Sequence, residues 1–230
     1  MTFTPDEITA IFLSLKVAIA ATLASLPLAV LVAWLLARRD FFGKALLNGL
    51  VHLPLVLPPV VTGYLLLIGF GRRGPLGQAL DACCGIVFSF RWTGAALACA
   101  VMAFPLVVRA IRLAIESIDP RLEAAASTLG ARPLLVFATI TLPLAAPGIL
   151  AGAILGFAKA LGEFGATITF VSNIPGETQT IATSIYSYTQ VPGGDAAAIR
   201  LTLVSIFIAM VALMASELLA RRMMRMASDL

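Results

Sequence analysis

Charged residues are scarce in this chain. Only 12% of its 230 residues are Asp, Glu, Lys or Arg, whereas 60% are hydrophobic, and the mean hydropathy is +1.00. Soluble domains carry about 25% charged residues, so this chain has too little polar surface to cover itself in water. The composition therefore excludes an ordinary soluble fold. It favours an all-α integral membrane protein, with room for about five or six spans of roughly 20 residues each.

Residues that commonly perform chemistry are equally sparse. The only histidine, His52, has no second histidine or cysteine near it, so we expect no metal site and interpret His52 as structural. An intramembrane enzyme would need a nucleophile with its base, and no such pair is evident. The cysteines at 83, 84 and 99 form neither a disulfide framework nor a metal spacing, and we interpret them as reduced packing residues.

A nucleotide-binding motif is absent as well. No G-x₄-G-K-[ST] string occurs, because Gly43-Lys44-Ala45 lacks the upstream glycine and the hydroxyl. We therefore predict that the chain is not an enzyme and holds no cofactor, and that any ATP and Mg²⁺ are bound by a partner. The net charge of +4 comes from basic residues scattered at segment ends, which does not favour nucleic-acid binding.

Five apolar segments are candidates to cross a bilayer. They cover residues 8–37, 46–70, 93–108, 142–160 and 201–219, and the fourth can extend towards residue 171. Pro54, Pro58 and Pro59 interrupt the second segment. A plain kink there is favoured over a break that turns a half-helix N-terminus towards an anion. Residues 181–190 are too short and too polar to span.

The distribution of Lys and Arg predicts the orientation, because these residues are retained on the cytoplasmic side. With the N-terminus outside, ten of the 16 lie inside: Arg38, Arg39, Lys44, Arg109, Arg112, Arg121, Arg132, Arg221, Arg222 and Arg225. Four lie outside, namely Arg72, Arg73, Arg91 and Arg200, and Lys16 and Lys159 fall within segments. We therefore predict about five spans, N-out and C-in, in a single membrane domain over residues 1–230.

A polar insert at residues 119–143 follows the third segment, on the cytoplasmic side of this topology. Asp119-Pro120 is typical of a helix start, and residues 121–129 are good helix formers. Gly130 suits the left-handed position after a helix, and Pro133 can open a second helix that runs into the fourth segment. The insert is either an ordinary loop or a docking element with a smooth alanine face.

The spacing of this insert resembles the cytoplasmic loop of permease subunits of bacterial ATP-binding-cassette (ABC) importers. In that loop, EAA-x₃-G is followed nine residues later by I-x-L-P. Nine residues separate Gly130 from Ile140, and Leu142-Pro143 follow in register. One departure is that the motif's glutamate falls at Ala124, whereas the acid here is Glu123.

Two further strings extend the resemblance to nearly the whole chain. Residues 50–67 (LVHLPLVLPPVVTGYLLL) and 160–181 (ALGEFGATITFVSNIPGETQTI) are similar to permeases for molybdate. Permeases for sulfate and thiosulfate share a comparable L-G-E-[FY]-G stretch, and the N-I-P-G-E-T string at 173–178 favours molybdate. Permeases for sulfate, thiosulfate or tungstate are the alternatives. A secondary transporter or channel would predict inverted repeats, and none is visible in the sequence.

The resemblance implies a MetI-like permease fold in the bacterial inner membrane that imports an oxyanion by alternating access. It implies a homodimer, two ATPase subunits and a periplasmic oxyanion-binding protein as partners. It also implies that one cluster couples the chain to the ATPase: Glu123, Ala124, Ala125, Ala126, Leu129 and Gly130.

Small and hydroxyl residues are candidates to line the substrate path or gate: Thr62, Gly63, Thr167 and Thr169. The alternative is that they allow helices to pack closely. Lys159 and Glu163 are four residues apart and share a helix face, and we favour a structural pair near the outer interface. The resemblance implies that Glu163, in the L-G-E-F-G stretch, helps to hold the outer gate or the subunit packing.

Overall fold

The computed structural model describes residues 3–228, apart from the side chains of residues 216, 217 and 219–228. Within this part of the chain every regular element is a helix. The side chains of Arg221, Arg222 and Arg225, which contribute to the predicted orientation, lie outside the described residues.

Four helical stretches are long and apolar enough to cross a membrane, as the sequence predicts for an all-α membrane protein. They are α1 (Pro5–Arg38), α5 (Trp92–Glu116), the stretch Pro133–Leu161 and residues Asp195–Ala215 of α11 (Asp195–Ser228). The prediction of residues 93–108 for the third segment is too short, because α5 extends to Glu116. Helix α5 continues past the apolar run through a charged last turn, in which Arg112 pairs with Glu116 (Nε–Oε1 2.7 Å).

The second predicted segment, 46–70, forms two helices that count as a fifth apolar span only when taken together, so the predicted plain kink is wrong. Helices α2 (Lys44–Val56) and α3 (Pro59–Phe70) meet at a bend of 115°. Two consecutive prolines cause the bend, because a residue that precedes proline is pushed out of the helical region. Leu57 and Pro58 are both extended, with ψ of 143° and 135°. Pro54, by contrast, lies inside α2 without ending it.

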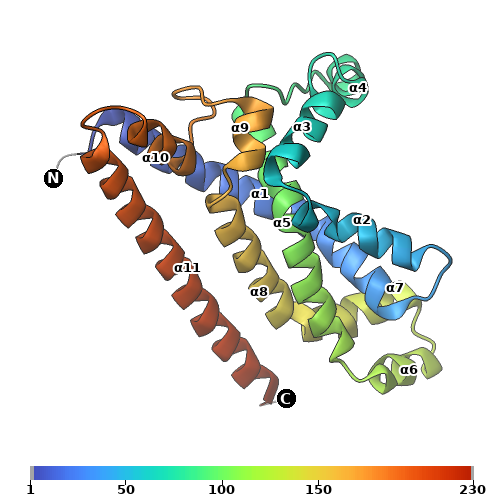
Figure 1. Ribbon diagram of the computed structural model, residues 1–230. Helices are drawn as coiled ribbons and strands as arrows, with labels where there is room; N and C mark the ends of the chain where they lie inside the picture. The colour runs from blue at the N-terminus through green and yellow to red at the C-terminus, as the bar shows by residue number, and fades with distance from the viewer. Residues whose placement is uncertain (1–2, 229–230) are drawn as a thin grey trace.

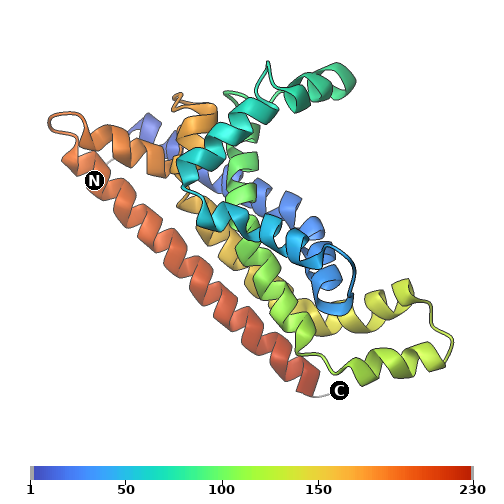
Figure 2. The same ribbon diagram turned by 45° about the vertical axis from the view of Figure 1, so that its right-hand side comes forward.

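Short helices lie at the two ends of the bundle (Figures 1 and 2). At one end are α4 (Pro75–Cys84), α9 (Gly165–Val171) and α10 (Ile181–Thr189); at the other are α6 (Pro120–Thr128) and α7 (Pro133–Val136). A π-helical turn, η1 (Phe137–Thr141), joins α7 to α8 (Leu142–Leu161). Residues 181–189 thus form a helix that is too short to span, as expected.

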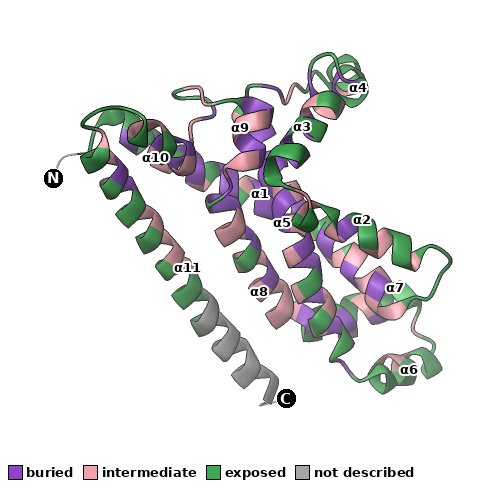
Figure 3. Ribbon diagram, in the orientation of Figure 1, coloured by how far each residue is buried: buried purple, intermediate pink, exposed green. Residues whose placement is uncertain are grey.

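The core lies where α1, α5 and α8 pack against one another, and α11 runs along α8 and α10. Small residues allow the close approach: Ala18 and Ala29 of α1 and Ala98 of α5 are fully buried. Large apolar side chains such as Phe12 and Phe207 are exposed, as expected for a surface that faces lipid. Exposed residues, green in Figure 3, recur along α11.

The packing role predicted for the cysteines holds for one of the three. Cys99 is buried and its thiol donates to the carbonyl of Ala160 at 3.4 Å. Cys83 and Cys84 are exposed, because α4 projects from the end of the bundle. The interpretation of these two as packing residues is therefore wrong.

An ion pair ties the start of α1 to α11. Glu7 is fully buried, and Arg200 donates to its Oε1 from Nη2 at 2.7 Å and from Nε at 3.1 Å. The other carboxylate oxygen accepts the backbone N–H of Thr4 at 2.7 Å, which completes a capping box. The pair holds α11 to the bundle at the end opposite α6.

Replacing Glu7 by glutamine should therefore destabilise the protein. Hydrogen bonds to charged groups contribute about 1.5–3 kcal/mol, which corresponds to a fall of roughly 3–12 °C in the unfolding midpoint. Thermal unfolding in detergent, followed by circular dichroism, measures the change. Asp6→Asn is the matched control, because Asp6 is exposed in the same helical turn. Equal midpoints for the two variants would show that the pair contributes nothing.

Candidate functional site

Helix α6 begins and ends at the residues that the sequence predicts. The Asp119 carboxylate accepts the backbone N–H of Arg121 at 2.9 Å, and Pro120 occupies the first helical position. Gly130 has a φ of +85°, the left-handed conformation that favours glycine. The N–H of Ala131 then closes the end on the carbonyl of Ala126 at 3.2 Å. Capping at both ends makes α6 a defined element rather than a loose loop.

One face of α6 is apolar and uncovered. Leu122, Ala125 and Leu129 stand three and four residues apart, so they share a face that we name the coupling face. All three are exposed, Leu129 to 89%. In the next helix Leu134 is 78% exposed. Such a surface at the polar end of a membrane protein fits a protein partner.

Glu123 lies on the inner side of α6. Its carboxylate pairs with Nε of Arg38, at the end of α1, at 3.1 Å, and accepts the hydroxyl of Thr141 at 2.6 Å. Arg38 also donates from Nη2 to the carbonyl of Ile118 at 3.0 Å. The group Arg38, Glu123 and Thr141, here named the Glu123 cluster, fastens α6 to α1 and to η1.

The structure therefore divides the predicted coupling residues into two sets. Ala125 and Leu129 belong to the coupling face, and Gly130 ends the helix beside them. Glu123 and Ala124 line a cavity of about 500 Å³ between α6 and the end of α1, and Ala126 is half-buried. Sequence reasoning did not find Arg38 and Thr141, because no local pattern links residues 85 and 18 positions away from Glu123.

The predicted path residues gather at the contact between α3 and α9. A Cβ added to Gly63 would lie 2.5 Å from the carbonyl oxygen of Ala166 and 2.9 Å from Cβ of Thr169. A Cβ added to Gly165 would lie 2.8 Å from Cβ of Pro59. The two helices touch through glycines on both sides, which is how small residues bring membrane helices together.

The hydroxyl groups at this contact support the packing interpretation. Thr167 donates to the carbonyl of Phe164 and Thr169 to that of Gly165, both at 2.8 Å and both within the same segment. Thr62 is buried, and its hydroxyl has no hydrogen-bond partner among the described residues. A role in the gate stays a prediction for these residues.

Lys159 and Glu163 form the ion pair that their spacing predicts. The Lys159 ammonium lies 2.6 Å from Oε2 of Glu163, whose side chain is only 2% exposed. The other oxygen, Oε1, accepts the backbone N–H of Ala166 at 3.1 Å. Glu163 thus bridges the break between α8 and α9, and the role at the outer gate or in subunit packing that the resemblance implies stays a prediction. His52 is also in a structural contact, with Nδ1 2.8 Å from the carbonyl of Asn48.

Replacing Gly63 by valine should disrupt the contact between α3 and α9. The new Cβ meets backbone atoms of Ala166, which cannot move aside as a flexible side chain can. Overpacking of this kind costs about 1–3 kcal/mol, and the unfolding midpoint in detergent should fall by roughly 2–12 °C. Gly49→Ala is the control, because a Cβ there meets nothing within 4 Å. A Gly63→Val protein as stable as the control would contradict the assigned close contact.

Comparisons with known proteins agree with this architecture. The "Molybdenum transport system permease protein ModB" of Haemophilus influenzae is 59% identical over 219 residues, which cover 95% of this chain and 96% of that protein. The "Sulfate transport system permease protein CysT" of Salmonella typhimurium is 37% identical over 182 residues, 79% of this chain and 65% of that protein.

Solved structures share the fold at low sequence identity. The inward-facing MetNI methionine ABC transporter contains a chain with a TM-score of 0.73 at 14% identity, covering 94% of this chain and 95% of that one. A bacterial alginate ABC transporter in complex with an alginate-bound periplasmic protein gives a TM-score of 0.74 at 19% identity, with 95% and 80% covered.

The helical spans and the capped helix at one end define a multi-pass membrane permease of the MetI-like fold. A family model described as "Binding-protein-dependent transport system inner membrane component" matches residues 25–225. This chain belongs to that family, and it is a permease subunit of an ABC importer in the bacterial inner membrane.

Proposed function

We propose that this chain is the permease subunit of a molybdate importer, through which the oxyanion crosses the inner membrane by alternating access. One observation carries the cargo assignment. Identity with the Haemophilus influenzae molybdenum permease is 59% over nearly the full length of both proteins, against 37% over a shorter stretch for the sulfate permease. Sulfate, thiosulfate or tungstate permeases share the same fold and mechanism and are the second candidates.

The energy for transport comes from the hydrolysis of ATP, which a partner subunit binds together with Mg²⁺. We assign to the complex two copies of this chain, two ATPase subunits and a periplasmic oxyanion-binding protein. The coupling face of α6 binds the ATPase. It lies on the cytoplasmic side, because the chain is oriented with its N-terminus outside and its C-terminus inside. A dianion cannot enter hydrocarbon without a large desolvation cost, so the path is a water-filled route between two copies of the chain. No resident cofactor or metal takes part.

The contacts in the structure suggest how closure of the ATPase reaches the membrane. Through the Glu123 cluster, a displacement of α6 acts on α1 and on η1. Because η1 continues into α8, the displacement is carried along that helix to Lys159. The ion pair with Glu163 passes it to α9, which lies against α3 at Gly63. Coupling of this kind needs a rigid element that both sites bias, and capped α6 supplies one.

Reconstitution tests the assignment. The chain is placed in vesicles with the ATPase and the binding protein, and ATP-dependent uptake of labelled molybdate is measured beside uptake of sulfate. We expect molybdate uptake that needs all three proteins and that excess sulfate does not block. Uptake by the chain alone would overturn the ABC mechanism. Uptake that sulfate abolishes would assign the second candidate function.

A further inference from the structure

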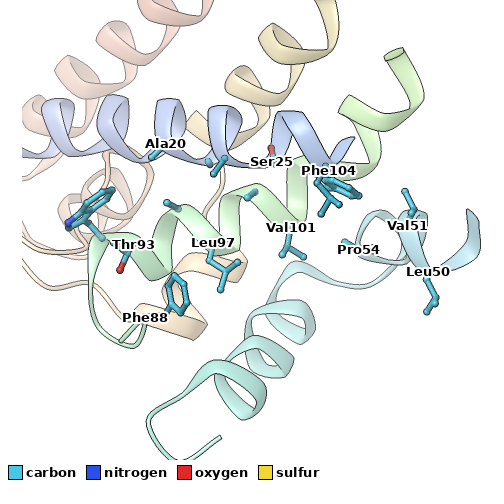
Figure 4. Close-up of a pocket in the computed structure, with 16 residues that line it drawn as sticks. Ala20, Ser25, Leu50, Val51, Pro54, Phe88, Thr93, Leu97, Val101 and Phe104 are labelled. Carbon is cyan, nitrogen blue, oxygen red and sulfur yellow. The ribbon is translucent and has the colours of Figure 1, made fainter. Parts of the chain in front are cut away.

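An apolar groove lies between α1, α2 and α5, remote from the coupling face. Its volume is about 630 Å³. Figure 4 shows Ala20 and Ser25 of α1 opposite Leu97 and Val101 of α5, with Pro54 of α2 towards one end. The hydroxyl of Ser25 already donates within α1, to the carbonyl of Thr22 at 3.2 Å. The walls therefore favour a hydrocarbon occupant.

The length of the groove matches one leaflet of a bilayer. Along α5 its lining runs from Trp92 to Phe104, which at 1.5 Å per residue is about 18 Å. The hydrocarbon core of a bilayer is about 30 Å thick, so one leaflet provides roughly 15 Å. The groove is therefore long enough for a lipid acyl chain that extends through one leaflet.

Charged side chains lie at one end of the groove. Trp92 lines both the groove and a second cavity of about 690 Å³ at the end of the bundle opposite α6. The charged residues that line this second cavity are Lys16, Arg91 and Glu177. The Lys16 ammonium lies 3.8 Å from the centre of the Trp92 ring. Two cations, one carboxylate and a tryptophan thus lie at the start of the apolar helix α5, and such side chains are typical of the membrane–water interface.

We infer that the groove and this cavity together form a binding site for a phosphatidylethanolamine molecule of the leaflet opposite α6. Lys16 and Arg91 bind the lipid phosphate, and Glu177 accepts the headgroup ammonium. One acyl chain runs along α5 past Leu97 towards Pro54. Because Pro54 lies in α2, just before the bend into α3, a lipid in this site holds the broken span against α1 and α5.

Tryptophan fluorescence provides a direct test, because the chain has only two tryptophans. Trp34→Phe leaves Trp92 at the proposed site. Trp92→Phe leaves Trp34, which packs against Phe137 near α6 with ring centres 5.4 Å apart. Each full-length variant is reconstituted in phosphatidylcholine with increasing fractions of phosphatidylethanolamine that carries brominated, quenching acyl chains. Every sample is referred to the same variant in unbrominated lipid.

We expect quenching of Trp92 to saturate at a low brominated fraction, whereas Trp34 should respond only in proportion to the bulk lipid. Adding Lys16→Ala and Arg91→Ala to the Trp34→Phe variant should raise the fraction for half-maximal quenching about fivefold to thirtyfold. Adding Glu177→Gln should abolish the preference for phosphatidylethanolamine over phosphatidylglycerol.

Three results would overturn the proposal. Proportional quenching of both tryptophans would mean that lipid contacts the groove without binding to a site. Loss of Trp92 quenching on addition of inorganic phosphate or molybdate would assign the cavity to a small anion. Efficient disulfide cross-linking between two copies that carry Leu97→Cys would show that a second chain covers the groove.

Discussion

Substituting tryptophan for Ala125 should separate the permease from its ATPase. Ala125 is exposed in the middle of the coupling face, so a bulky side chain there leaves α6 folded and obstructs a closely fitting partner. Overpacking a contact costs about 1–3 kcal/mol, which corresponds to a loss of about 5–150-fold in affinity. Co-purification of the ATPase and ATP hydrolysis stimulated by the loaded binding protein should both fall by this amount.

Ala82→Trp is the matched control for this substitution. Ala82 is also an exposed alanine in a short helix, but α4 lies at the opposite end of the bundle. The ATPase should co-purify with the Ala82→Trp protein as it does with the unmodified chain. Undiminished co-purification with the Ala125→Trp protein would remove α6 as the docking element.

The Glu123→Gln substitution should leave the ATPase bound and disconnect it from transport. Glutamine cannot balance the charge of Arg38, and the hydrogen bond from Thr141 is weakened. Hydrogen bonds to charged groups contribute about 1.5–3 kcal/mol, so ATP-dependent uptake should fall about 10–150-fold. The ATPase should still co-purify, because the carboxylate faces away from the coupling face.

Glu116→Gln controls for the loss of a negative charge at the same end of the bundle. Glu116 pairs with Arg112 on an exposed surface, where ion pairs contribute little, so uptake should change less than about twofold. If the ATPase dissociates from the Glu123→Gln protein as it does from the Ala125→Trp protein, Glu123 contacts the ATPase directly. Normal uptake would show that the Glu123 cluster does not transmit movement.

Much of the fold could be predicted because it depends on local patterns. Composition and apolar length predicted the spans, and Asp119, Pro120 and Gly130 predicted both ends of α6. The predictions that failed concern features for which the local sequence pattern allows more than one structure. Two adjacent prolines push the residues before them out of the helical region, but the sequence pattern does not give the size of the bend, which is 115°. The apolar run of the third segment ends at residue 108, whereas α5 extends to Glu116, because a helix can continue in water beyond its apolar part.

The candidate site was predictable in part for the same reason. The exposed face of α6 follows from helical spacing alone, and so does the pair of Lys159 and Glu163. The direction in which Glu123 points does not follow from helical spacing. It depends on Arg38, which lies at the end of another helix, α1. Which residues touch across α3 and α9 likewise depends on the tertiary arrangement and not on sequence distance.

The bend between α2 and α3 has a chemical consequence beyond its angle. A chain that leaves the helical path at membrane depth normally strands amide hydrogens where no water can accept them, at several kcal/mol each. Residues 58 and 59 are both proline and carry no amide hydrogen at all, while the carbonyl of Pro58 accepts from Val61 at 2.9 Å. The two prolines therefore make the bend more compatible with a lipid environment, because they remove two hydrogen-bond donors from it. Any other residue at either position would add an amide N–H that needs an acceptor.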